Sequence, residues 1–384
     1  MKKTASILTA LLLCFLLAAP ACALDAQDPA APEISAPSAV LIERETGTVL
    51  YAKNETERRP PASVTKVMTL LLIAEAVDAG ELSLDDMVTA SERAASMGGS
   101  QIWLEVGEQL SVSDMIKCVA VVSANDCAVA LAEHLCGSEA AFVERMNQRA
   151  EELGLENTQF TNCTGLFDDT AHYTCALDIA VMSRELLSHE WIKQYTTIWM
   201  DSVRDGKSEL TNTNKLVRFY EGCTGLKTGY TSTAMYCLSA SAERDGTEYI
   251  AVIMHAESID SRNADASTLL DYGFANFRLC PLTSGEELPQ VAVELGTVES
   301  VTPVYDGGGA VLLRTKDAEG LSWSVDLPES VSAPVRAGER LGTLTLSNSA
   351  GPVAEVPLLA GETSERLSAP GIFTKLLSFL LCAE

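Results

Sequence analysis

The position of the strand-like segments constrains the fold most. Two β-rich runs, Val40–Ile42 and Val49–Tyr51, flank a turn at Thr46-Gly47, which is typical of a hairpin. A second pair of strands is predicted in MYCLSASAERDGTEYIAVIMHA, with its turn at Asp245-Gly246. Between the pairs, from Ser63 to about Leu187, apolar residues recur at helical spacing. This order predicts an α+β domain over residues 37–279, in which helices pack on one sheet that is assembled from distant parts of the chain.

The first 23 residues have the pattern of a secretory signal peptide. Lys2 and Lys3 precede an apolar run from Ile7 to Ala19, and Ala21-Cys22-Ala23 offers a cleavage site. A lipoprotein signal at this cysteine is the alternative, but Pro20 stands where that signal favours a small or β-branched residue. We therefore expect an exported protein at the extracytoplasmic face of the cell membrane or in the cell envelope.

Charge and cysteine content exclude several classes of partner and cofactor. The net charge of −26 makes nucleic acid and polyphosphate poor partners. Eleven cysteines, two of them in the signal, leave an odd number without a C-x-x-C motif, so neither a disulfide framework nor a zinc site is indicated. We expect Cys118, Cys127 and Cys136 to be small core residues on helices.

The regions outside the α+β domain differ in composition. Residues 24–36 are rich in Ala and Pro and read as an exposed linker. Beyond Pro281, alternating runs such as QVAVEL, GAVLLRT and GERLGTLTLSN are broken by Gly, Pro and Asp. This pattern predicts a separate all-β domain over residues 280–366, expected as a β-sandwich.

Residues 367–384 form a predicted amphipathic helix. In GIFTKLLSFLLCAE, one face carries the apolar side chains of Ile372, Phe373, Leu376, Leu377 and Leu380. The stretch is too short to span a bilayer, so we interpret it as an anchor that lies in the plane of the membrane surface. The alternative is a helix docked on the β domain.

The stretch PPASVTKVMTLLL contains the first candidate for chemistry. Ser63 and Lys66 lie one turn apart on the same face of a predicted helix start, so the lysine amine can reach the serine oxygen. A serine hydroxyl is a weak nucleophile and needs an adjacent base. Burial and the helix N-terminus both disfavour the ammonium form, which would make Lys66 a proton acceptor. An exposed lysine near a helix start is the structural alternative.

Two further elements follow along the chain. Ser123-Ala124-Asn125 lies in a predicted turn between two helices and can point a hydroxyl and an amide into a cleft, although a second Ser-x-Asn occurs at residues 261–263. Lys227-Thr228-Gly229 lies on a predicted strand edge, where a cation and a hydroxyl can bind a carboxylate and the glycine admits a close substrate backbone. No G-x-S-x-G, H-E-x-x-H, P-loop or G-x-G-x-x-G motif is present.

S-x-x-K, Ser-x-Asn and K-T-G in this order are the signature set of penicillin-binding proteins and class A β-lactamases. The chain resembles the low-molecular-mass penicillin-binding proteins that are serine-type D-alanyl-D-alanine carboxypeptidases. The segments that carry this resemblance are LIERETGTVLYAKN, PPASVTKVMT, SANDCAVALAEH, MNQRAEELGLENTQFTN, GLFDDTAHYT, GLKTGYTSTA and LLDYGF. Cys163 departs from the family, which usually has proline there. The resemblance implies a β-lactamase/DD-peptidase-like catalytic domain with an antiparallel sheet, followed by a small all-β domain and an amphipathic helix.

The resemblance also implies roles for individual residues. Ser63 corresponds to the acylated nucleophile, Lys66 to its proton acceptor, and Ser123 to a proton relay. Substrate binding falls to Asn125 for the amide and to Lys227 and Thr228 for the terminal carboxylate, with assistance from Arg262, while Gly229 lets the substrate backbone lie close along the strand. The oxyanion hole consists of the backbone N–H groups of Ser63 and Tyr230.

The implied reaction is release of the terminal D-alanine from peptidoglycan stem pentapeptides through a Ser63 acyl-enzyme, which β-lactams also form. Neither a metal nor an organic cofactor is expected. A β-lactamase-like hydrolase is the first alternative, but no E-x-x-L-N element lies between the Ser-x-Asn and K-T-G motifs. A transpeptidase or endopeptidase shares the motifs, and an inactive cell-wall-binding module would keep the fold.

Overall fold

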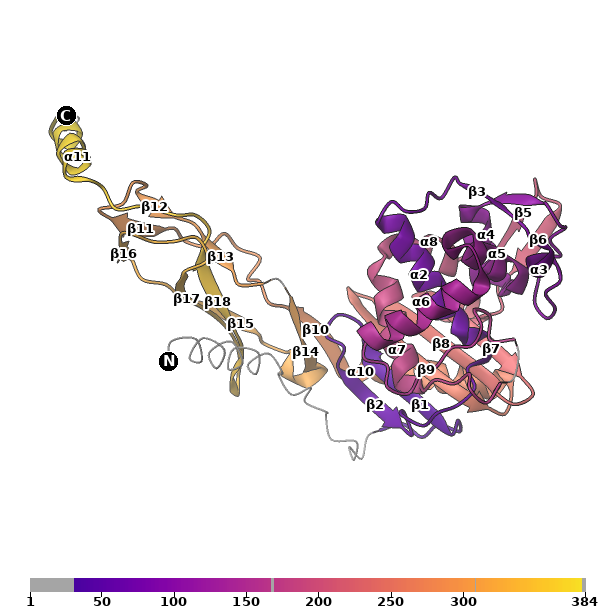
Figure 1. Cartoon of the computed structure of the whole chain (residues 1–384). Helices are drawn as coiled ribbons and strands as arrows, with labels where there is room; N and C mark the ends of the chain where they lie inside the picture. The colour runs from indigo at the N-terminus through magenta and orange to yellow at the C-terminus, as the bar shows by residue number, and fades with distance from the viewer. Residues whose placement is uncertain (1–30, 167–168, 308, 382–384) are drawn as a thin grey trace, which may run out of the picture. The chain divides into compact units, whose positions relative to one another are not determined.

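The computed structural model describes residues 31–166, 169–307 and 309–381. These residues form two compact units, one ending at Phe274 and the other beginning at Ala275 (Figure 1). The predicted secretory signal, residues 1–23, lies outside the described residues.

The first unit is built on a five-stranded antiparallel sheet with the strand order β2-β1-β9-β8-β7 (Figure 1). Its strands are β1 (Ser38–Glu43), β2 (Val49–Lys53), β7 (Cys223–Thr231), β8 (Met235–Arg244) and β9 (Thr247–Ala256). The N-terminal hairpin pairs with β9, which confirms that distant segments build one sheet. The predicted turn at Asp245-Gly246 joins β8 to β9, and both residues have positive φ, 49° and 75°.

Helices cover both faces of this sheet. The helices of this unit are α2 (Lys66–Asp78), α3 (Glu92–Ala95), α4 (Val112–Val122), α5 (Asn125–Cys136), α6 (Glu139–Glu152), α7 (Ala176–Ser188), α8 (Lys193–Thr196), α9 (Leu216–Phe219) and α10 (Ile259–Asn276), with short 3₁₀ helices η1 (Ala62–Thr65) and η2 (Glu190–Ile192). Side chains alternate along a strand, so Ile250 and Val252 of β9 join the main core, where α7 packs on β9. Tyr249 points to the other face and packs against Gly273 of α10.

The sequence patterns did not predict two short strand pairs. One lies between α2 and α4, and the other lies between α8 and α9. They are β3 (Met87–Thr89) with β4 (Gln109–Ser111) and β5 (Met200–Val203) with β6 (Ser208–Thr211). Strands of three or four residues are too short to show a period in the sequence.

Helix α2 is central to the domain. Its side chains are buried on almost every side, including Val67, Leu70, Leu71 and Ala74. A helix that is apolar all round is stabilised by tertiary packing on all its faces. Its first turn, which carries Lys66, is therefore held rigidly within the core.

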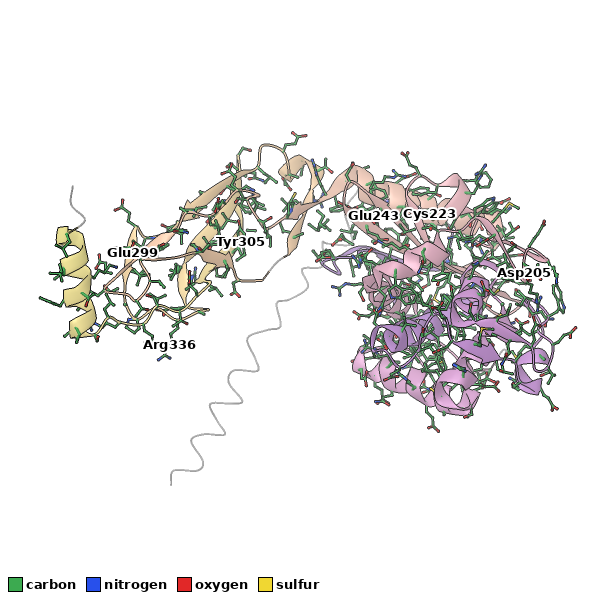
Figure 2. All side chains as sticks on the ribbon, turned by 90° about the horizontal axis from the view of Figure 1, so that it is seen from above. Asp205, Cys223, Glu243, Glu299, Tyr305 and Arg336 are labelled. Atoms are coloured by element: carbon green, nitrogen blue, oxygen red, sulfur yellow. The ribbon has the colours of Figure 1, made fainter. Side chains whose placement is uncertain are left out.

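The second unit is all-β, as predicted. Its strands are β10 (Phe277–Pro281), β11 (Val291–Glu294), β12 (Ser300–Val301), β13 (Pro303–Tyr305), β14 (Ala310–Arg314), β15 (Ser322–Asp326), β16 (Ser330–Ser332), β17 (Arg340–Asn348) and β18 (Gly351–Ala360), with η3 (Thr315–Asp317). They form sheets in the orders β13-β18-β17-β15, β12-β11-β16 and β10-β14. Figure 2 labels Tyr305, which packs on a small core with Leu344, Val356 and Leu358. Helix α11 (Ala369–Leu381) follows.

The residues at the two expected ends of the catalytic domain, near 37 and 279, take part in ordered contacts. Strands β10 and β14 pair with each other and both belong to the second unit, so the expected limit after residue 279 falls within β10. Residues 24–36 were expected to be an exposed linker, and its last two residues are anchored to the domain. The backbone N–H groups of Ser35 and Ala36 donate to the carboxylate of Asp265 on α10, at 3.0 and 2.7 Å. Ala36 is buried, at 1% exposure.

Candidate active site

The structure places Ser63 and Lys66 in contact at the start of the central helix. Ser63 lies in η1 and Lys66 is the first residue of α2, so the chain tightens into a 3₁₀ turn just before the α-helix begins. Lys66 Nζ lies 3.0 Å from Ser63 Oγ. The spacing of three residues thus brings the amine to the hydroxyl, as the sequence predicted.

Lys66 is completely buried and its amine contacts no carboxylate in the part of the chain that is described. Its other partners are Asn125 Oδ1 at 2.6 Å and the carbonyl of Thr164 at 2.8 Å. Burial lowers the pKa of Lys66 to about 7, although the Cys163 thiol and the Asp126 carboxylate act in the opposite direction. A neutral amine has two protons for the two carbonyl oxygens, which leaves its lone pair for the Ser63 hydroxyl.

Ser123 and Asn125 form the turn between α4 and α5. Ser123 has a left-handed φ of 65°, which ends α4 and turns the chain toward Lys66. Its Oγ is buried and has no hydrogen-bond partner within the described ranges. A buried hydroxyl without a partner is costly and suits a site that a substrate fills. Asn125 differs, because its amide is occupied: Oδ1 accepts from Lys66 and Nδ2 donates to the Gly98 carbonyl at 2.7 Å.

Strand β7 lies directly against the turn that carries Ser63. A Cβ on Gly229 would stand 2.8 Å from the Pro61 carbonyl oxygen and 3.0 Å from Ser63 N, so only glycine permits this approach. The next residue, Tyr230, is in register with Tyr236 of β8. The predicted oxyanion donors, the N–H groups of Ser63 and Tyr230, therefore belong to two segments in close contact.

Lys227 and Arg262 are two buried cations near each other. Lys227 donates to the Thr228 carbonyl at 2.9 Å, and Arg262 donates to Asn263 Oδ1 at 3.1 and 3.0 Å. Burial, reinforced by the charges of Lys66 and Arg262, holds the pKa of Lys227 well below its usual value, and burial lowers that of Arg262 to about 10. Neither forms an ion pair with an acidic residue in the described ranges. Such an arrangement favours an anionic ligand.

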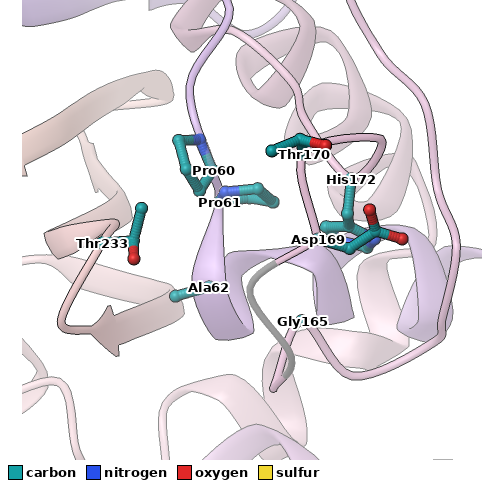
Figure 3. Close-up of a pocket in the computed structure, with 8 residues that line it drawn as sticks. All are labelled: Pro60, Pro61, Ala62, Gly165, Asp169, Thr170, His172 and Thr233. Carbon is teal, nitrogen blue, oxygen red and sulfur yellow. The ribbon is translucent and has the colours of Figure 1, made fainter.

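Three residues around the site had no signal in the sequence. The Thr164 carbonyl accepts from Lys66, Thr213 Oγ1 accepts from Thr228 Oγ1 at 2.7 Å, and His172 contacts Thr65. Thr164 and His172 lie 98 and 107 residues along the chain from their partners, and Thr213 lies 15 residues before Thr228. None of the three stands in a motif, so only the structure places them at the site. A pocket of 210 Å³ opens beside Ala62 and Gly165, with His172 in its wall (Figure 3). Across the described residues, no cluster of three His, Cys, Asp or Glu side chains is placed to hold a metal ion.

Comparison with known sequences identifies the family. Residues 25–258 match the family described as D-alanyl-D-alanine carboxypeptidase, and residues 280–366 match the C-terminal domain of penicillin-binding protein 5. The chain belongs to the D-alanyl-D-alanine carboxypeptidase family. The carboxypeptidase is 44% identical over 336 residues to D-alanyl-D-alanine carboxypeptidase DacF of Bacillus subtilis, and the match covers 86% of each chain.

Solved structures agree with this assignment. Penicillin-binding protein 5 of Haemophilus influenzae is 30% identical with a TM-score of 0.74, over 88% of this chain and 99% of that one. Penicillin-binding protein D2 of Listeria monocytogenes, solved in an ampicillin-bound form, is 31% identical with a TM-score of 0.58, over 64% of this chain and 99% of that one. The expected fold and the serine-type D-Ala-D-Ala carboxypeptidase activity are thereby confirmed.

Proposed function

We propose that Ser63 is the nucleophile of this carboxypeptidase and that it acts on peptidoglycan stem pentapeptides. The observation that carries the proposal is the contact of Ser63 Oγ with a fully buried lysine amine that has no carboxylate partner in the described chain. A lysine held in this way is neutral for much of the time near pH 7 and can accept the hydroxyl proton.

The reaction follows from this geometry in two stages. Ser63 Oγ bonds to the carbonyl carbon between the last two D-alanines as its proton passes to Lys66, and the oxyanion is bound by the N–H groups of Ser63 and Tyr230. The carbon–nitrogen bond then breaks, and D-alanine leaves with a proton that Lys66 returns through the Ser123 hydroxyl. Water next attacks the ester, which releases the tetrapeptide and restores Ser63.

The terminal carboxylate binds at Lys227 and Thr228, with Arg262 adding positive charge nearby. Gly229 lets the substrate backbone lie along β7. The Asn125 amide now binds Lys66 and Gly98. When the substrate binds, the amide leaves these partners and orients the substrate. β-Lactams carry a carboxylate and a reactive carbonyl, so they occupy the same positions and acylate Ser63.

Release of D-alanine from a synthetic peptide ending in Lys-D-Ala-D-Ala tests the proposal. We expect Ser63→Ala to lower the rate by at least about 10³-fold, since the covalent step is lost. Ser188→Ala, at an exposed serine at the end of α7, is the matched control and should keep the wild-type rate. Undiminished release by Ser63→Ala would refute the proposed nucleophile.

The relatives are cell-wall enzymes, which implies action outside the cytoplasm. We propose further that the protein is exported by its N-terminal signal and that α11 binds the membrane surface. Phe373, Leu376 and Leu377 of α11 are 66%, 59% and 46% exposed, so this face is not docked on the β domain. Lys375 pairs with Glu299, labelled in Figure 2, at 3.2 Å. Within the described ranges, no helix has both the length and the apolar character to cross a membrane.

Flotation with phospholipid vesicles tests the role of the helix. We expect the mature chain to float with the vesicles and a chain lacking residues 371–384 to remain in the dense fraction, because an apolar face holds the helix at the interface. Phe373→Ser with Leu377→Ser should abolish flotation, whereas Lys375→Ser, on the polar face, should retain it. Equal flotation of the truncated chain would show that α11 is not the anchor.

A further inference from the structure

The turn before Ser63 has an unusual backbone. Ala62 has a φ of 48°, a left-handed conformation that alanine rarely adopts. The carbonyl of Ala62 belongs to the same planar peptide unit as the N–H of Ser63, so the two groups point in opposite directions. Any contact that fixes this carbonyl therefore also fixes the direction of the Ser63 N–H, one of the two proposed oxyanion donors.

The side chain of Thr65 provides that contact. Thr65 Oγ1 is completely buried and donates to the Ala62 carbonyl at 2.8 Å. A hydroxyl has a single proton, so its second contact, with His172 Nε2 at 2.8 Å, requires the imidazole to donate.

His172 is oriented in turn by the backbone. Its Nδ1 accepts from the N–H of Thr161 at 3.0 Å, which leaves the proton on Nε2 and fixes one neutral tautomer. His172 is 3% exposed, and burial lowers its pKa to about 4, so this tautomer persists across the pH range in which Lys66 becomes neutral. The ring also packs edge-on against Phe160, with centroids 5.8 Å apart.

The loop that follows Thr161, the residue whose N–H binds His172, packs against the Ala62 carbonyl at Gly165. A Cβ on Gly165 would stand only 1.8 Å from the Ala62 oxygen, so only glycine fits at position 165. Thr164, the preceding residue, accepts a hydrogen bond from Lys66. Figure 3 shows Ala62, Gly165 and His172 gathered around the pocket beside the nucleophile turn.

We infer that the chain of hydrogen bonds from Thr161 N–H through His172 and Thr65 to the Ala62 carbonyl orients the oxyanion-binding N–H of Ser63. His172 and Thr65 are thus positioning residues that do not touch the substrate. The inference rests on the proposed role of Ser63 as nucleophile. It assigns to His172 a function in the acylation step, although no histidine takes part in the proton transfers.

Stopped-flow acylation by penicillin separates positioning from binding. Thr65→Val keeps the shape of the side chain and removes its hydroxyl, while Thr65→Ser keeps the hydroxyl. We expect Thr65→Val to lower the limiting acylation rate by about 30-fold, which is less than the roughly 10²-fold or more that outright loss of an oxyanion donor costs, because the N–H is misdirected but still present. Thr65→Ser should stay within about threefold of wild type. The dissociation constant of the complex formed before acylation should not change, because Lys227 and Thr228 are untouched.

A double variant adds a readout that a purely structural role does not predict. His172→Phe keeps a ring against Phe160 and breaks the same chain of hydrogen bonds. Combined with Thr65→Val, it should slow acylation no further than the slower single variant, because both remove one linkage. Additive losses, or a wild-type acylation rate in either folded single variant, would overturn the inference. If Thr65→Val does not fold, the acylation rate of His172→Phe alone decides: a wild-type rate overturns the inference.

The two proposals fail in different ways. If the adduct in wild-type protein lies on a residue other than Ser63, the proposed function fails. If Ser63 carries the adduct and Thr65→Val forms it at the wild-type rate, only the positioning role fails.

Discussion

Replacement of Lys66 with methionine is expected to lower the rate of Ser63 acylation by about 10³-fold, within the range that loss of a general base costs. Methionine retains an apolar side chain of similar length and leaves no unpaired charge in the buried site. It removes the group that lies 3.0 Å from Ser63 Oγ. The measurement is the second-order rate constant for penicillin acylation, followed by mass spectrometry.

The pH dependence of the acylation rate tests whether Lys66 acts as a base. The base must be neutral, and burial lowers the pKa of Lys66 to about 7, so wild-type acylation should fall about tenfold per pH unit below 7 and level off above it. The Lys66→Met variant should lose this inflection. Lys207→Met, at an exposed lysine between β5 and β6, is the control and should reproduce the wild-type profile. A wild-type rate that is flat between pH 5 and 8 would contradict the assignment of Lys66 as proton acceptor.

Replacement of Lys227 with methionine is expected to remove the preference for a free terminal carboxylate. Wild-type enzyme should cleave a peptide ending in D-Ala-D-Ala about 10²-fold better, in kcat/KM, than the same peptide ending in D-Ala-D-alaninamide, because a desolvated charge pair is lost with the amide. The Lys227→Met variant should cleave both at a similar low rate. Release of D-alanine or D-alaninamide is measured by mass spectrometry.

Arg262→Met is the companion variant. Its guanidinium is close enough to Lys227 to lower the pKa of that lysine but already donates to Asn263, so we expect a smaller loss of preference, about tenfold. If Lys227→Met keeps the full preference and Arg262→Met loses it, Arg262 is the principal carboxylate-binding residue.

Local spacing predicted much of the site. Ser63 and Lys66 are one turn apart, and Lys227, Thr228 and Gly229 follow one another on a strand, so their relative placement depends on backbone geometry alone. The sheet was predictable for a similar reason, because a hairpin signal and two later strand runs can bury their apolar residues only against the intervening helices.

The remaining features depend on tertiary packing. Lys66 is 98 residues from Thr164, whose backbone carbonyl has no signature in the sequence. Cys163, where the family usually has proline, lies in the loop that supplies the Thr164 contact, and its carbonyl accepts a hydrogen bond from Thr69. His172 likewise stands in no motif that the sequence shows. Its partner Thr65 lies 107 residues away, and only the folded loop brings them together.

Location of the covalent adduct tests the central claim most directly. The mature protein is incubated with penicillin, digested, and its peptides are sequenced by mass spectrometry. The geometry at the start of α2 predicts a single penicilloyl group on Ser63, in the peptide that contains PPASVTK, and none in Ser63→Ala. An adduct on another serine, or an equal yield of adduct in Ser63→Ala, would contradict the assignment of Ser63 as the nucleophile.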